Sequence, residues 1–342
     1  MKILVTGGVG YIGSHTVVEL LEQGYEVLII DNLSNSYIEV LDHIKTITGK
    51  RPSFFQIDLC DRSAVVDFFS TNHVDAIIHF AAFKAVGESV EKPLAYYRNN
   101  LVSLINILED MPQFEVKNIV FSSSCSVYGE PDNLPVSEQT PVKKAESPYA
   151  NTKQISEEIL SDFIKTSDVK GIALRYFNPV GAHETALIGE LPLGTPVSLV
   201  PVITQTAIGK REVLYVNGDD YDTPDGSCIR DYIHVVDIAK AHIVAIERLL
   251  NNKQKSNFEI FNLGTGKGNT ILEVIRTFEK VSKKKLNYKI GPRRPGDVVK
   301  VYADTTLANK ELGWMAERNL EEMLASAWKW EQKLAQSEKL SV

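Results

Sequence analysis

The sequence predicts an α/β protein with a Rossmann-type, doubly wound parallel sheet and a smaller, interleaved C-terminal substrate domain. Strand-like apolar runs alternate with helical segments from residue 1 to about residue 176, which is the pattern of a parallel sheet with crossover helices. After Asn178 the alternation gives way to segments with Pro and Gly, such as 191–196 and 217–226. We expect a first domain at 1–176 and a second at 177–342, with segments near 232–263 returning to the first.

Each expected element follows from its own run of residues. Short runs rich in Val, Ile, Leu and Phe indicate buried strands, and longer runs with apolar residues on one face indicate helices. We place strands at 3–5, 27–30, 53–57, 76–80, 118–122, 171–175 and 260–263, and helices at 14–23, 99–109, 151–165 and 236–250.

A glycine cluster lies where the first strand turns into the first helix. Gly7, Gly10 and Gly13 let the backbone approach a phosphate closely. The helix N-terminus then offers the unpaired amides of Tyr11 and Ile12 and a positive dipole end. The cluster therefore indicates a site for the pyrophosphate of a dinucleotide.

Asp31 follows the second strand at the position of a ribose-binding acid. Its carboxylate would accept hydrogen bonds from both adenosine ribose hydroxyls and repel a 2′-phosphate. The next five residues, Asn32, Leu33, Ser34, Asn35 and Ser36, include no Arg or Lys to hold such a phosphate. NAD is therefore favoured over NADP.

Composition restricts the class of partner. The chain has 342 residues, 44% of them hydrophobic, and a net charge of −7, which argues against nucleic acid. No apolar run approaches the roughly 20 residues that span a bilayer. Cys60, Cys125 and Cys228 form no CxxC pair, and the seven histidines show no ligand spacing, so we expect no metal site. A cytoplasmic enzyme with no membrane or nucleic-acid partner fits best.

A second motif supplies acid–base chemistry. Ser147 and Pro148 are a helix-start signal, which places Tyr149 in the first turn and Lys153 one turn later on the same face. A tyrosine hydroxyl is a poor base at pH 7, since its reference pKa is about 10. A nearby ammonium group and the positive helix end both favour the phenolate, so we expect Lys153 to make Tyr149 a usable base.

The strand run from Asn118 to Phe121 leads directly into three serines, Ser122, Ser123 and Ser124, at the edge where open parallel sheets bind ligands. We expect Ser124 to hydrogen-bond a substrate hydroxyl and align it with Tyr149. Tyr149, Lys153 and Ser124 are therefore the candidate catalytic residues.

Seven segments together resemble the extended short-chain dehydrogenase/reductase family, and within it the nucleotide-sugar 4-epimerases. The resemblance covers nearly the whole chain, and the later segments are far more specific than the glycines. The segments are 5–15, 31–36, 79–89, 122–129, 147–153, 175–183 and 230–234.

This resemblance implies the binding residues. For NAD it implies Gly7, Gly10, Tyr11, Ile12, Gly13, Asp31, Asn32, Leu33, Ser34, Asn35, Ser36, Asp58, Leu59, Phe80, Ala81, Ala82, Phe83, Lys84, Asn99, Ser122, Tyr149, Lys153 and Phe177. For a UDP-sugar it implies Lys84, Ser124, Tyr149, Asn178, Ser198, Leu199, Tyr215, Asn217, Arg230, Tyr232, Arg294, Asp297 and Val301. Two of these are arginines, whose planar forks suit a diphosphate.

The resemblance also implies a reaction, in which sugar C4 is oxidised with bound NAD and the ketone is reduced on its opposite face. UDP-glucose and UDP-galactose would then interconvert. A 4,6-dehydratase would carry Thr-Asp-Glu after the strand, whereas here Cys125 and Ser126 follow Ser124. A uronate epimerase or decarboxylase stays open as an alternative. A non-catalytic NAD sensor is disfavoured, because such proteins typically lack the tyrosine and lysine.

Three positions bear on the substrate. Asn217 stands where these epimerases usually have an aromatic residue, and Ser198 stands where Asn is common. Val301 occupies a position that is tyrosine in enzymes restricted to plain hexoses. The smaller side chain predicts space for a 2-acetamido group, and so activity on UDP-GlcNAc and UDP-GalNAc. A homodimer is expected from the resemblance, with the helices at 99–109 and 151–165 as interface elements.

Overall fold

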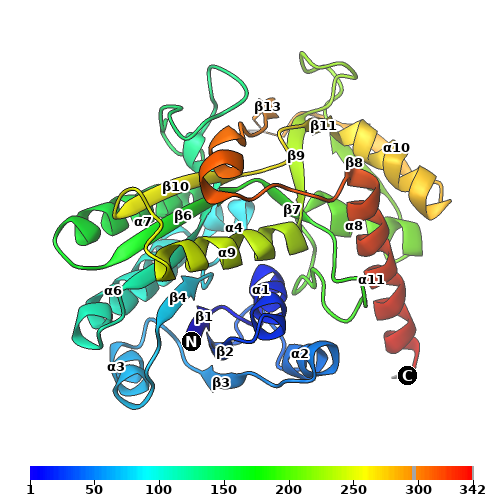
Figure 1. Ribbon diagram of the computed structural model, residues 1–342. Coiled ribbons are helices and arrows are strands. Elements are labelled where there is room, and N and C mark those ends of the chain that lie inside the picture. Colours follow the sequence, from blue (N-terminus) through cyan, green and yellow to red (C-terminus); the bar gives the residue numbers. More distant parts are fainter. Residues whose placement is uncertain (295–297, 341–342) are drawn as a thin grey trace.

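A central sheet of seven parallel strands organises the molecule. The computed structural model describes residues 1–294 and 298–340. In chain order the sheet strands are β1 (Lys2–Thr6), β2 (Glu26–Asp31), β3 (Ser53–Gln56), β4 (Ala76–His79), β5 (Asn118–Ser124), β6 (Lys170–Tyr176) and β10 (Phe258–Leu263). Their order across the sheet is β3–β2–β1–β4–β5–β6–β10 (Figure 1). The chain order reverses between β1 and β4, which is where open parallel sheets form a ligand crevice.

Helices cover both faces of this sheet. On one face lie α1 (Tyr11–Glu22), α2 (Val40–Thr48) and α9 (Val235–Leu250), and on the other lie α3 (Arg62–Thr71), α6 (Ser103–Gln113) and α7 (Pro148–Lys165). Strand β1 shows why, because Ile3 and Val5 pack on the first face while Leu4 packs on the second. The doubly wound fold predicted from the sequence is confirmed.

Short elements connect these layers beside the carboxyl ends of the strands. After β4 come α4 (Val86–Glu91), α5 (Pro93–Tyr97) and a π-helical turn, η1 (Arg98–Val102). After β5 comes a 3₁₀ turn, η2 (Cys125–Tyr128). Within the described ranges, no helix combines the length and apolar character that crossing a bilayer requires.

The remaining elements lie along the top and the right side of Figure 1, where α11 descends to the C-terminus. They are β7 (Asn178–Val180), α8 (Leu199–Ile208), β8 (Leu214–Asn217), β9 (Ile229–His234), β11 (Gly268–Thr270), α10 (Ile271–Ser282), β12 (Tyr288–Gly291), β13 (Lys300–Val301), η3 (Ala308–Leu312) and α11 (Leu320–Leu340). Strand β9 pairs with β7, β11 and β13, and β8 pairs with β12. Between these segments the chain returns to the central sheet through α9 and β10.

Two element boundaries differ from the sequence-based prediction in ways that affect the site. Helix α1 begins at Tyr11 rather than at residue 14, so its first turn lies inside the glycine cluster. Strand β5 continues to Ser124, because its last three residues pair with Leu174, Arg175 and Tyr176 of β6. The serines therefore form the end of a strand and not a loop.

Candidate active site

The glycine turn between β1 and α1 is built for close backbone packing. Gly7 has φ +71°, and a Cβ placed on it would lie 2.9 Å from the nitrogen of Ala81. A Cβ on Gly13 would lie 2.2 Å from the carbonyl oxygen of Gly7. Only glycine fits at these two positions, so the turn brings the start of α1 against the end of β4.

The N-terminus of helix α1 has no side-chain cap. Its N-cap residue is Gly10, and none of the described side chains hydrogen-bonds the amides of its first turn. The amides of the first turn, which include those of Tyr11 and Ile12, therefore point toward the space above the glycine turn with the positive end of the helix dipole. A pyrophosphate fits this position without any charged side chain.

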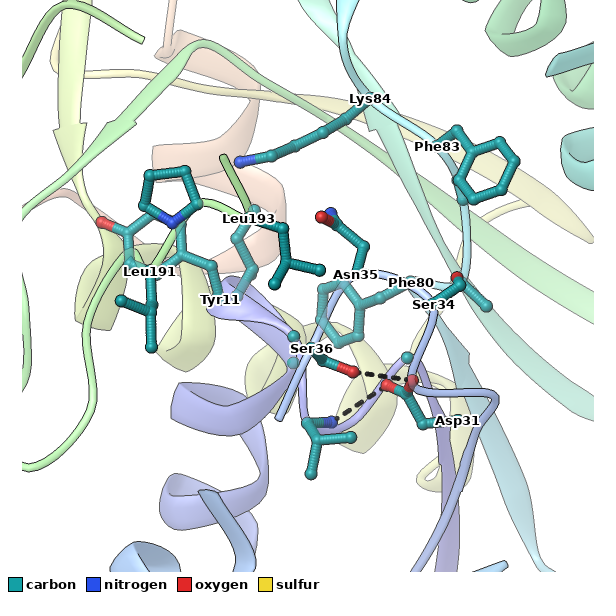
Figure 2. A pocket seen from close by; sticks show the side chains of 18 of the residues that line it. Tyr11, Asp31, Ser34, Asn35, Ser36, Phe80, Phe83, Lys84, Leu191 and Leu193 are labelled. Carbon is teal, nitrogen blue, oxygen red and sulfur yellow. Dashed lines mark hydrogen bonds between the residues drawn. The ribbon is translucent and has the colours of Figure 1, made fainter. Parts of the chain in front are cut away.

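Asp31 lies at the end of β2 and faces the same space (Figure 2). Its Oδ1 accepts hydrogen bonds from the amide of Leu33 at 2.9 Å and from Ser36 Oγ at 2.9 Å, and its Oδ2 accepts from the amide of Val9 at 3.3 Å. Burial raises the pKa of Asp31, and these three hydrogen bonds oppose the rise. Each carboxylate oxygen keeps lone-pair capacity for a ribose hydroxyl.

A cavity of about 1210 Å³ joins these features. It runs from the glycine turn and Asp31 to the ends of β5 and β6, so it places a nucleotide cradle and two of the three candidate catalytic residues, Tyr149 and Lys153, in one space. All residues implied for NAD line this cavity except Leu33 and Phe177. The lining members are Gly7, Gly10, Tyr11, Ile12, Gly13, Asp31, Asn32, Ser34, Asn35, Ser36, Asp58, Leu59, Phe80, Ala81, Ala82, Phe83, Lys84, Asn99, Ser122, Tyr149 and Lys153.

Helix α7 carries the tyrosine and the lysine as predicted. Ser147 is its N-cap, its hydroxyl accepts a hydrogen bond from the amide of Ala150, and Pro148 is the first helical residue. Tyr149 and Lys153 follow on one face of the helix and line the cavity. The start of α7 therefore lies at the carboxyl ends of the sheet strands.

Lys153 is buried against β5. Its Nζ donates a 2.6 Å hydrogen bond to the carbonyl oxygen of Ser122 and lies 4.8 Å from the centre of the Phe121 ring. Burial lowers the pKa of Lys153 to about 8, and the negative charge of Glu157 opposes this change. The ammonium group is therefore charged at neutral pH and loses its proton as the pH rises through about 8.

The pKa of Tyr149 differs from the expectation. Burial raises it above the ordinary value for tyrosine, the neighbouring Tyr176 raises it further, and a hydrogen bond with Ser124 opposes the rise. Desolvation outweighs the stabilisation of the phenolate that the sequence analysis attributed to Lys153 and the helix dipole. The ligand-free site thus keeps Tyr149 protonated at neutral pH.

Of the loop at 187–198, most of which lines the cavity, only Ser198 was predicted to belong to the site. Glu190 Oε1 accepts hydrogen bonds from Lys84 Nζ at 3.0 Å and from Ser198 Oγ at 3.1 Å. Figure 2 shows Lys84 reaching toward the ring of Tyr11, 5.7 Å from its centre, with Leu193 beside it. The only signal for this loop was its content of Pro and Gly, which marks a loop but assigns it no partner.

Most residues implied for the sugar nucleotide lie outside the cavity lining. Lys84, Tyr149 and Ser198 line it. Strands β7, β9 and β13 bring four others together, because Asn178 pairs with Tyr232 and Arg230 pairs with Val301. The remaining positions are Ser124 at the end of β5, Leu199 at the start of α8, Tyr215 and Asn217 on the exposed side of β8, and the exposed Arg294. Asp297 lies outside the described residues.

Val301 packs in a small cluster next to the catalytic strand. The side chain is 7% exposed and shares this cluster with Phe177 and Ala303, and Cys125 packs against it. Because Cys125 follows Ser124, the cluster adjoins the end of β5. Burial raises the pKa of Cys125 to about 12, so this thiol stays protonated.

A dinucleotide cradle that opens onto a tyrosine–lysine pair at the end of a parallel strand defines the short-chain dehydrogenase/reductase class. The family model described as GDP-mannose 4,6 dehydratase matches residues 4–327. The UDP-glucose 4-epimerase of Bacillus subtilis is 51% identical over 332 residues, 97% of each chain. The chain belongs to the UDP-glucose 4-epimerase family.

Solved structures of the same family agree. The enzyme of Stenotrophomonas maltophila, with bound NAD and formylated UDP-arabinopyranose, is similar with a TM-score of 0.95 and 45% identity, covering 98% of this chain and 99% of that chain. The enzyme of Bifidobacterium longum, in complex with NAD+ and UDP, is similar with a TM-score of 0.93 and 46% identity, covering 97% and 98%.

Proposed function

We propose that this protein interconverts UDP-glucose and UDP-galactose at sugar C4 with NAD as its cofactor. The observation that carries the proposal is the single cavity in which the glycine turn and Asp31 lie at one end and Tyr149 and Lys153 at the other. Oxidation of an alcohol requires a hydride acceptor beside the carbon and a proton acceptor beside its hydroxyl oxygen at the same time. This cavity supplies room for both.

The residues present fit NAD. Gly13 allows the helix start to approach a pyrophosphate, and the first turn of α1 supplies amide donors. Asp31 supplies a carboxylate for the adenosine ribose, and Asn32 to Ser36 bring no cation for a 2′-phosphate. When bound, NAD supplies a hydride acceptor for C4 and then returns the hydride to the ketone.

Tyr149 is the proposed proton acceptor for the sugar 4-hydroxyl and the donor on its return. Ser124, the last residue of β5, is proposed to orient the same hydroxyl. Lys153, held against β5 by the carbonyl of Ser122, keeps a positive charge near the developing phenolate. To accept that proton Tyr149 must be the phenolate, so its own proton must leave to solvent before the hydride departs; burial opposes this loss in the ligand-free site, and the positive charge of Lys153 would favour it.

The substrate is proposed to be held through its nucleotide. Arg230 and Tyr232 on β9, with Asn178 on the neighbouring β7, form one wall, and Arg294 is the second arginine proposed for the diphosphate. Firm binding of the nucleotide with few sugar contacts leaves the 4-keto sugar free to turn over, so that hydride returns to its opposite face.

We also propose activity on UDP-GlcNAc and UDP-GalNAc. Support comes from Val301, whose side chain is small and lies in the cluster beside Ser124. A tyrosine at this position would add an aromatic ring next to the sugar, whereas valine leaves room for a 2-acetamido group.

Two further properties are proposed. A homodimer through α6 and α7 is supported by exposed apolar side chains on the adjoining α4 and α5, where Val86, Val90 and Leu94 are 53%, 61% and 80% exposed. A cytoplasmic location is supported by Cys60 and Cys125, which form no disulfide in the part of the chain that the structure describes. Light scattering of the native protein and of Leu94→Asp tests the dimer.

A proton NMR time course with UDP-galactose tests the proposed function. Purified protein without added NAD should produce the anomeric signal of UDP-glucose, and Tyr149→Phe should slow this by about 10²- to 10⁴-fold, the usual contribution of a positioned acid–base group. If wild-type protein, even with added NAD, changes neither UDP-galactose nor UDP-glucose, the proposed function is wrong.

A further inference from the structure

Helix α7 presents a third polar residue to β5 beyond the tyrosine and the lysine. Tyr149, Lys153 and Glu157 recur every four residues and so share one face of the helix. Glu157 Oε1 accepts a 2.5 Å hydrogen bond from the hydroxyl of Ser123. This serine lies between Ser122, whose carbonyl accepts a hydrogen bond from Lys153, and Ser124, which opposes the rise in the pKa of Tyr149.

Two of the three serines at the end of β5, Ser122 and Ser123, are therefore hydrogen-bonded to different residues of α7. The bond from Ser123 is made by its side chain, whereas Ser122 uses its backbone carbonyl. In a strand, alternate side chains point to opposite faces, and the side chain of Ser123 points to the face that α7 covers. The bond between Ser123 and Glu157 consequently sets the position of α7 along the direction of strand β5.

An arginine holds Glu157 in place. Arg175 Nε donates to Oε1 at 2.9 Å, and Arg175 Nη2 donates to Oε2 at 2.5 Å, which is a bidentate pair. The two side chains are 5% and 9% exposed. Arg175 lies on β6 directly beside Ser123 in the strand register. The carboxylate thus joins one helix to two neighbouring strands.

The hydrogen-bond network continues away from α7 toward the apolar cluster that contains Val301. Arg175 Nη1 donates to the hydroxyl of Tyr128 at 3.0 Å, and that hydroxyl donates to Asn262 Oδ1 at 2.6 Å. Asn262 Nδ2 in turn donates to the carbonyl of Val136 at 2.9 Å. Val136 and Tyr128 share their apolar cluster with Val301.

Stability alone gives little reason for this pair. A buried ion pair often contributes no more than well-packed apolar side chains of the same volume, because desolvation offsets the attraction. What the pair supplies is geometry, since a bidentate contact admits one orientation of the two groups. Small shifts of the catalytic groups affect the rate, because a misplacement of about 1 Å can reduce it about 100-fold.

We propose that Glu157, held by Arg175, is a positioning residue that sets α7 against β5 and so aligns Tyr149 and Lys153 with the substrate. The proposal rests on the proposed function, because it assigns Glu157 a role in that reaction. Glu157 touches neither the cavity nor the reacting atoms; it acts through Ser123 and through the helix that both catalytic side chains share.

Glu157 also contributes charge. Its carboxylate raises the pKa of Lys153 against the effect of burial. Tyr149 and Tyr176 line the same cavity as Lys153, and the charge of Lys153 acts on His79 of β4. Burial, with the charge of Lys153, lowers the pKa of His79 to about 3, so this ring stays neutral.

The chain offers a matched control in a second ion pair of the same domain. Arg248 on α9 holds Glu259 on β10 in a bidentate contact of 2.7 and 3.0 Å, with both side chains 10% exposed. Glu259→Gln therefore breaks a comparable pair that does not touch α7 or the cavity. Comparing it with Glu157→Gln separates a positioning effect from general loss of stability.

The experiment measures kcat, KM and the pH profile of epimerisation for wild type, Glu157→Gln and Glu259→Gln. Glu157→Gln should lower kcat by about 10- to 100-fold, leave KM for UDP-galactose within about twofold, and move the alkaline decline of kcat to lower pH, because Lys153 loses a neighbouring carboxylate. Glu259→Gln should lower the melting temperature but leave kcat and its pH profile unchanged. Equal effects of the two variants on kcat, or an unshifted profile in Glu157→Gln, would overturn the proposal.

Ser123→Ala provides a second variant that keeps the ion pair and removes only its bond to β5. It decides the question if Glu157→Gln does not fold. A several-fold lower kcat in Ser123→Ala supports the proposal, and a wild-type kcat contradicts it. Wild-type protein in the same assay distinguishes the two levels of inference: if it does not epimerise, the proposed function fails, whereas if it does and the variants match it, only the role of Glu157 fails.

Discussion

Lys153 donates a 2.6 Å hydrogen bond to the carbonyl oxygen of Ser122. The bond holds the lysine of α7 against the last residues of β5, where Ser124 meets Tyr149. Cation, proton acceptor and serine therefore come to one edge of the sheet through a single helix–strand contact. The pH dependence of the reaction follows from this contact.

We expect activity to decline as pH rises through about 8. Burial lowers the pKa of Lys153 to about 8, so its charged form dominates below this pH and its neutral form above it. Loss of the cation removes stabilisation from the phenolate of Tyr149. Rates of epimerisation between pH 6 and 10 measure this decline, and Lys153→Met, which never carries the charge, should be slower and lack it. If Lys153→Met showed the same alkaline decline as wild type, a group other than Lys153 would be responsible for it.

Asp31 should determine the choice between NAD and NADP. Asp31→Asn removes the charge but keeps the shape, so hydrogen bonds to a charged acceptor worth about 1.5–3 kcal/mol are weakened. We expect NAD affinity to fall about tenfold or more and NADP affinity to rise relative to it, as measured by calorimetry on protein stripped of cofactor. Asp42→Asn, at an exposed carboxylate on α2, is the control and should change neither affinity. An unchanged preference in Asp31→Asn would exclude a ribose-binding role.

Gly13 should be intolerant of a methyl group. Its Cβ in Gly13→Ala would lie 2.2 Å from the carbonyl oxygen of Gly7, which forces the turn to shift and opens the cradle. We expect the purified variant to carry little NAD, measured from the absorbance of the released nucleotide. Gly87→Ala on α4 is the matched change, because a Cβ there meets nothing within 4 Å. Full NAD content in Gly13→Ala would show that the turn does not hold the cofactor.

Val301 should determine whether 2-acetamido sugars are accepted. Val301→Tyr adds a ring in the cluster of Phe177 and Ala303 beside the end of β5. We expect turnover of UDP-GalNAc to fall at least tenfold while turnover of UDP-galactose is retained, because one additional clash selects against the larger sugar. Parallel NMR time courses on the two substrates compare them directly. Equal loss on both would remove Val301 from substrate selection.

Local sequence patterns predicted which residues of the proposed cofactor site lie together. The glycine turn and Asp31 are set by a strand, a tight turn and a helix that follow one another in the chain, and both line the cavity. The N-cap at Ser147 is likewise a local signal, and the structure confirms it.

Contacts between distant segments were not predictable in the same way. Glu190 meets Lys84 across the cavity, and Glu157 meets Arg175 between helix and strand, but no spacing in the sequence pairs them. The direction of the pKa of Tyr149 was wrong for a related reason. Desolvation depends on what covers the hydroxyl in three dimensions, whereas the sequence showed only the lysine one turn away.

Retention of a C4 deuterium label tests the central claim most directly. Protein without added NAD is incubated with UDP-galactose that carries deuterium at C4, in ordinary water, and the product is analysed by NMR and mass spectrometry. Removal and return of the same hydride at one carbon predicts UDP-glucose that keeps deuterium at C4 and takes up no hydrogen from solvent. UDP-glucose whose C4 label has exchanged with water would contradict the account, because the hydrogen would then have left as a proton.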